Sequence, residues 1–177
     1  MTNADGPSTA ADQATAALRH GLATLAYRAA KVLRDVPPGF GAMEFGAATR
    51  RPVRIVAHMA DLMAWAPTFL TGKPTWKADG GSDWHLEVER FFSGLGEFDR
   101  RLADTPPSVD VIYKLMQAPL ADALTHVGQL AMLRGMAGHP IRPESYAGAD
   151  IVAGRVGREQ TPARRAFDGD ASVPTRS

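Results

Sequence analysis

The sequence predicts an all-α protein, a four-helix bundle with a long crossover between helices two and three. Apolar residues recur at three- and four-residue steps over four long windows, and stretches containing proline or glycine separate these windows. No window alternates apolar and polar residues between hairpin turns, so a β-sheet is not expected. A chain of 177 residues provides enough apolar surface for one domain with tails.

The first two helices are defined by their apolar period and by prolines. The first is predicted over residues 9–35, and Pro37 ends it because a residue before proline is driven out of the helical region. After a glycine-containing loop, Pro52 suits the first turn of a second helix over residues 52–70. The apolar positions of the first helix are Leu18, Leu22, Leu25, Ala26, Ala29, Val32 and Leu33.

Residues 71–81 form a connection rich in glycine and proline. Fully extended, eleven residues reach about 36 Å, which exceeds the roughly 30 Å length of a 20-residue helix. The connection can therefore cross the whole bundle. Ser82 or Asp83 can cap a third helix over residues 83–103, which breaks at Thr105.

A short helical turn over residues 109–117 is predicted before the fourth helix. Pro119 suits the first position of that helix, and the Gly-His-Pro sequence from Gly138 supplies its stop. The predicted boundaries are a flexible N-terminus at residues 1–9, the bundle at 10–140 and a mostly irregular tail at 141–177.

Composition excludes several classes of function. The chain has no cysteine, so it contains no disulfide, thiolate metal site or cysteine nucleophile, and the cytoplasm is the compartment that fits best. The net charge is +1, with basic residues scattered among acids, so no nucleic acid partner is expected. No apolar window is long enough to span a membrane, and the start lacks a signal sequence, so we expect a soluble, cytoplasmic protein.

Two polar intrusions on apolar helix faces predict a metal site. Asp122 and His126 lie four residues apart, which stacks them on one helix face, and His58 interrupts the apolar face of the second helix. A lone buried histidine is more often a hydrogen-bonded core residue. Two intrusions on different helices match the way bundles build metal sites from facing side chains. His58, Asp122 and His126 would leave an open position on zinc, nickel, manganese or ferrous iron.

Five further residues are candidates around this site. Asp61 is either an acceptor that orients a ligand histidine or a surface charge. Gln129 can touch a ligand or bond to backbone, and Arg134 can balance an anion or interact with the helix dipole. Tyr146 is a candidate pocket residue from the tail. His85, in the first turn of the third helix, is the reserve ligand, although an exposed histidine is the simpler interpretation.

The segment HMAD, followed about sixty residues later by DALTHVGQLAMLRGMAGHPI, resembles the DinB-like family, also described as YfiT-like metal-dependent hydrolases. The resemblance covers residues 18–146. It implies an up-down-down-up four-helix bundle, a long crossover between helices two and three, and a divalent metal bound by three histidines. The first ligand falls on His58. The closing H-x-x-x-H pair falls on Asp122 and His126, so a carboxylate replaces one histidine, or the chain has lost its metal.

The wider superfamily includes enzymes that use low-molecular-weight thiols, such as mycothiol, as cosubstrate. The resemblance therefore implies thiol S-transfer or hydrolysis of a small-molecule substrate, with zinc or nickel as the first metals to consider. The alternative is a non-catalytic stress-response or ligand-binding protein of the same fold without metal. A third interpretation is a helical dimerisation module with Trp65, Trp76 or Trp84 at its interface. Bundles of this size often pair through an apolar helix face, so a homodimer is expected.

Overall fold

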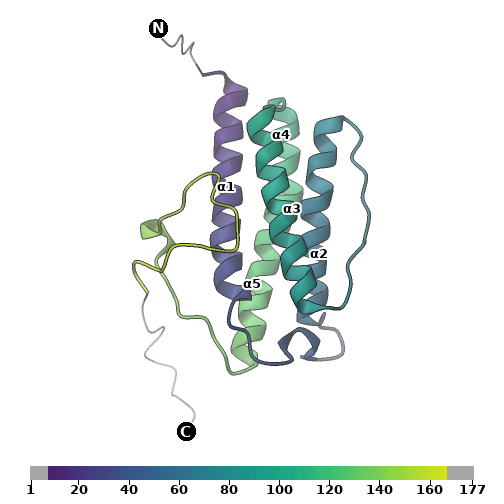
Figure 1. The fold of residues 1–177 in the computed structure, drawn as a ribbon, viewed down its shortest axis with the longest axis vertical. Helices are drawn as coiled ribbons and strands as arrows, with labels where there is room; N and C mark the ends of the chain where they lie inside the picture. The colour runs from purple at the N-terminus through teal and green to yellow at the C-terminus, as the bar shows by residue number, and fades with distance from the viewer. Residues whose placement is uncertain (1–7, 167–177) are drawn as a thin grey trace.

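The computed structural model describes residues 8–166, which form an all-helical assembly (Figure 1). An isolated bridge between Glu144 and Ala166 is the one β-type pairing in this part of the chain. The all-α class with four long helical segments is thus confirmed. These segments are α1 (Ala10–Leu33), α2 (Pro52–Trp65), α3 (Trp84–Asp104) and a fourth made of α4 (Val109–Leu115), η3 (Met116–Leu120) and α5 (Ala121–Met136).

The helix starts follow the capping signals in the sequence. Thr9 caps α1 by accepting a bond from the Asp12 amide at 3.1 Å, and the Asp12 carboxylate accepts one from the Thr9 amide at 2.9 Å. This reciprocal pair satisfies amides that have no partner within the helix. Pro52 occupies the first turn of α2, and Asp83 caps α3 through the Leu86 amide. All three predicted starts are confirmed to within a residue.

Two predicted helix boundaries were wrong, and proline explains both. The second helix was expected to run to residue 70, but α2 ends at Trp65 and continues as the tighter 3-10 turn η2 (Ala66–Thr71) around Pro67. The fourth helix was expected to start at Pro119 after a separate turn. Instead α4 runs into α5 through the π-helical η3, which contains Pro119. The π-helical turn accommodates the ring of Pro119 and its lack of a backbone amide hydrogen, so the helix continues through this residue.

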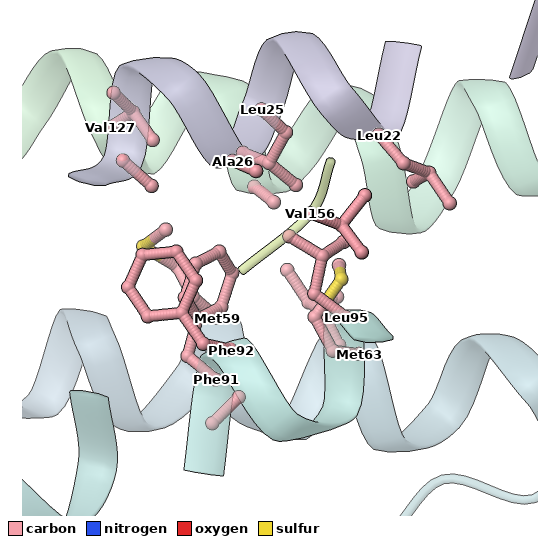
Figure 2. Close-up of a cluster of buried hydrophobic side chains, with 14 of the residues drawn as sticks. Leu22, Leu25, Ala26, Met59, Met63, Phe91, Phe92, Leu95, Val127 and Val156 are labelled. Atoms are coloured by element: carbon pink, nitrogen blue, oxygen red, sulfur yellow. The ribbon is translucent and has the colours of Figure 1, made fainter. Parts of the chain in front are cut away.

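The core lies where the four helical segments meet. Figure 2 shows Leu22, Leu25 and Ala26 of α1 across from Met59 and Met63 of α2. Leucine and phenylalanine side chains of α3 fill the space beside them, and α5 contributes Val127. The helices α2 and α3 pack closely, because a Cβ on Gly94 would lie 3.0 Å from the Met63 Cβ. Burial of these apolar surfaces is the main stabilising term.

Residues 72–83 run beside α2 and connect its end to the start of α3 (Figure 1). The buried Asp61 carboxylate accepts a bond from the Asp79 amide at 3.2 Å and from Arg90 of α3 at 2.7 Å. Glu87 accepts a bond from the Gly81 amide at 2.6 Å. Gly80 approaches α2 so closely that a Cβ there would lie 2.7 Å from the Ala57 Cβ. This crossover is therefore fixed to the bundle beside His58.

The described part of the tail, residues 137–166, is irregular apart from the 3-10 turn η4 (Tyr146–Gly148), and it lies along α1 (Figure 1). Glu144 is buried and bonds to Tyr27 and Lys31 of α1, and Val156 joins the core. The predictions for residues 1–7 and 167–177 lie outside the described residues. Within residues 8–166, no helix combines the length and apolar character needed to cross a membrane.

Candidate metal centre

His58, Asp122 and His126 come together between α2 and α5. Asp122 and His126 share one face of α5 because they are separated by one helical turn, and His58 faces them from α2. One potential ligand atom from each residue lies within 4.8 Å of the others. The three residues that the sequence singled out on two helices thus form a single cluster, called the triad below.

The Asp122 carboxylate bridges the two histidines. Its Oδ2 lies 3.2 Å from Nε2 of His58, and its Oδ1 lies 3.3 Å from Nε2 of His126. The two imidazole rings are perpendicular, with centroids 5.0 Å apart. The exposed fraction of the side chain is 9% for His126, 26% for His58 and 43% for Asp122, so solvent reaches the triad from the Asp122 side.

The side chain of Gln129 faces Nδ1 of His126 and indicates which ring nitrogen carries the proton. Its amide oxygen lies 2.7 Å from Nδ1 of His126, and a carbonyl oxygen can only accept a hydrogen bond. Nδ1 therefore donates, and in a neutral imidazole Nε2 then carries a lone pair. That lone pair faces a carboxylate oxygen of Asp122, which is also an acceptor.

Two acceptors at 3.3 Å repel each other unless a positive charge lies between them. The charge can be a second proton on His126 or a metal ion that both atoms coordinate. Two imidazole nitrogens and a carboxylate oxygen suit zinc, nickel, manganese and ferrous iron. The His/Asp/His group can thus hold a divalent ion, and a hydrogen bond from a ligand histidine to an amide oxygen is the usual outer support of such a ligand.

The triad lines an open cavity of about 550 Å³. Thr49 and Arg50 line it from the loop before α2, and Gln129 lines it from α5. Its apolar lining consists of Ala48, Ile55, Met132 and Leu133. The volume and the mixed lining are typical of sites for small molecules.

Trp76 of the crossover forms an aromatic neighbour of the triad. Its ring lies 5.5 Å from His58 and 5.5 Å from Trp65, measured between centroids. The sequence pointed to Trp76 only as a candidate interface residue. Its approach to His58 depends on the path of residues 72–83, which the Asp61 and Glu87 hydrogen bonds determine. No local pattern in the sequence carries that information.

Four other predicted site residues do not line the triad cavity: Asp61, His85, Tyr146 and Arg134. Asp61 lines a smaller neighbouring cavity with His58, but its carboxylate bonds to Arg90 and Asp79. His85 is exposed and lines a separate hollow at the start of α3. Tyr146 packs edge-on against Tyr27, with the Arg28 guanidinium 4.0 Å from its ring centre.

Arg134 serves the fold at the end of α1. Its guanidinium donates to the carbonyl oxygens of Val32, Arg34 and Asp35 and to that of His139. Burial lowers the pKa of this guanidinium. Since the last carbonyls of a helix lack partners within it, Arg134 supplies the missing donors at the end of α1 and does not line the triad cavity.

Comparison of the chain with protein-family models, with curated proteins and with solved structures gives no match. The site is therefore interpreted from its own geometry.

Proposed function

We propose that this protein is a DinB-like metalloprotein, an up-down-down-up bundle in which His58, Asp122 and His126 hold a divalent ion facing an open cavity. The observation that carries the proposal is the acceptor pair formed by Nε2 of His126 and the Asp122 carboxylate. A site built only from hydrogen bonds would place a donor between them. A small-molecule substrate, a homodimer and a cytoplasmic location remain predictions.

The proposed reaction is thiol S-transfer or hydrolysis. A divalent ion with an open position lowers the pKa of a coordinated thiol or water, which makes it a nucleophile near neutral pH. The chain has no cysteine, so the thiol would come from a low-molecular-weight cosubstrate. His58, Asp122 and His126 would hold the ion, Gln129 would orient His126, and the apolar lining of the cavity would contact the apolar part of the bound molecule.

The test is elemental analysis by inductively coupled plasma mass spectrometry on protein purified without a histidine tag. We expect near-stoichiometric zinc or nickel in the wild-type protein and background levels in Asp122→Ala and His126→Ala. His85→Ala is the matched control, because it also removes one histidine but lies outside the triad. Metal content that is unchanged in the His126 variant would refute the proposal. Circular dichroism of each variant checks that the helices persist.

A second candidate is a ligand-binding protein of the same fold without metal. It is favoured by the direct contacts of the Asp122 carboxylate with both histidines, which a doubly protonated His126 would satisfy. In that case the protein takes up no zinc, nickel, manganese or ferrous iron on incubation. Nitrogen-15 NMR would then show both ring nitrogens of His126 protonated, whereas metal binding requires one of them to be free of a proton.

A further inference from the structure

Three arginines stand at the start of α2, and their side chains have different environments. Arg51 is paired with the Glu44 carboxylate, and Arg54 donates to the carbonyl oxygens of Gly80 and Gly81 at 2.9 and 3.0 Å. Arg50 makes no hydrogen bond or ion pair with any residue in the described range 8–166. Arg50 lines the triad cavity. It also lines the smaller neighbouring cavity, whose wall includes His58 and Trp76.

The loop that carries Arg50 is held in place by its neighbours. The Thr49 amide donates to the Gly46 carbonyl at 3.0 Å, which closes a turn, and the Glu44–Arg51 pair joins the loop to the start of α2. Gly46 has a φ of +132°, a conformation that favours glycine. The backbone of Arg50 is thus supported on both sides, while its exposed side chain lines the cavity without a hydrogen-bond or ion-pair partner among residues 8–166.

The cavity combines a cation with an apolar wall. Ile55, Met132 and Leu133 line it together with Arg50 and the triad. Asp122 lines it too, yet no ion pair joins Asp122 to Arg50, so the guanidinium is not neutralised from within the site. A planar guanidinium recognises carboxylate and phosphate groups through two parallel hydrogen bonds.

We propose that Arg50 binds the oxyanion group, carboxylate or phosphate, of a small molecule whose apolar part packs on Ile55, Met132 and Leu133. This assigns the substrate class of the triad cavity. The inference rests on the proposed function for its claim that the bound molecule reacts. The binding step itself depends on Arg50 and does not require the metal, which allows the two proposals to be tested separately.

The experiment is isothermal titration calorimetry on protein stripped of metal with a chelator, because a carboxylate can also coordinate a metal ion. The probes are hexanoate, hexyl phosphate and the neutral hexanamide. We expect at least one of the two anions to bind the wild-type protein more tightly than hexanamide does. Arg50→Ala should weaken that anion by about tenfold or more, the usual effect of losing a hydrogen bond to a charged group, and Arg50→Lys by less. The anion that binds more tightly identifies the natural group.

Arg158→Ala is the matched control, since it removes the charge of an exposed arginine that lines none of the cavities around the triad. Equal weakening in both alanine variants, equal binding of hexanamide, or no binding of either anion to the wild-type protein would each overturn the inference. If metal is bound stoichiometrically but Arg50→Ala does not change anion affinity, this inference alone fails. If no metal is bound but the Arg50 effect is present, the proposed function alone fails.

Discussion

Two polar clusters within the bundle differ in how their donors and acceptors are matched. Beside α1, the buried Glu144 carboxylate accepts from the Tyr27 hydroxyl at 2.6 Å and from the Lys31 ammonium at 2.8 Å. Each acceptor oxygen has a donor, and the charges cancel. In the triad, Nε2 of His126 and Oδ1 of Asp122 face each other as acceptors, and the Asp122 side chain is 43% exposed. The first cluster is complete, whereas the second is satisfied only by a second proton on His126 or by a bound cation.

The difference shows how a structural polar cluster can be told from a binding site. Burial of a charge is tolerated when partners satisfy it, and the Tyr27–Lys31–Glu144 cluster meets that condition without any ligand. The triad places three potential metal ligands on the wall of a cavity of about 550 Å³. We therefore expect mutations in the first cluster to change stability alone, and mutations in the second to change ligand binding.

The largest expected effect is on stability, at the α1 cluster. Glu144→Ala leaves the Lys31 ammonium, whose side chain is 11% exposed, without its counter-charge. Breaking a buried pair by removing one partner costs about 3 to 5 kcal/mol in the free energy of unfolding. Urea unfolding followed by circular dichroism measures it, and the metal content should stay at the wild-type level. A loss below about 1 kcal/mol would show that the tail leaves the bundle at little cost.

The next effect comes from adding metal to the triad. A ligand that binds only the folded state at 100 times its Kd raises the free energy of unfolding by about 2.7 kcal/mol. For a chain of 177 residues this corresponds to a rise in Tm of about 5 to 10 °C. Differential scanning fluorimetry with and without zinc should show this rise in the wild-type protein and in Glu144→Ala. The same rise in His126→Ala would place the bound zinc elsewhere.

A smaller effect is expected from the residue that orients His126. Gln129→Ala removes the acceptor 2.7 Å from Nδ1, so the ring is free to rotate and to change its tautomer. Loss of such outer support typically weakens metal affinity by about 10- to 100-fold. Competition with a chromophoric chelator measures the Kd. Gln13→Ala, an exposed amide of α1, is the control, and equal affinities in the two variants would contradict the role given to Gln129.

Local patterns predicted the helices and the residues of the triad, because the face on which each residue lies follows from the periodicity of its own helix. The i, i+4 spacing of Asp122 and His126 and the apolar context of His58 were sufficient to select the three residues. Patterns of this kind say nothing about loops. Arg50 and Trp76 reach the triad cavities from segments whose paths depend on contacts such as Gly46–Thr49 and Asp61–Asp79.

Two polar candidates for the pocket have partners that the sequence did not indicate. Arg134 was considered either as a partner for an anion or as a partner of the helix dipole, and its donors are used by carbonyl groups at the end of α1, about one hundred residues away in sequence. Asp61 was considered as a partner for His58, but Arg90 of α3 occupies its carboxylate. A charged side chain bonds to whatever the fold brings near it, and helix spacing does not predict partners from other elements.

The smallest expected effect sharpens the comparison through pH. Although burial raises the pKa of Glu144, hydrogen bonds from Lys31 and Tyr27 lower it overall below its usual value. The carboxylate of Glu144 therefore binds a proton less readily in the folded protein than in the unfolded chain. It contributes stability above the unfolded pKa of about 4.5, and that contribution is lost as the pH falls through the folded pKa.

The Glu144→Gln variant has no titrating group at this position, and its free energy of unfolding should fall less than that of the wild-type protein between about pH 5 and pH 3. Urea titrations at several pH values measure the two slopes, with Glu159→Gln on the exposed tail surface as the control. Identical slopes for wild type and Glu144→Gln would show that the α1 cluster does not hold its carboxylate in the charged form, and the contrast with the triad would then rest on metal binding alone.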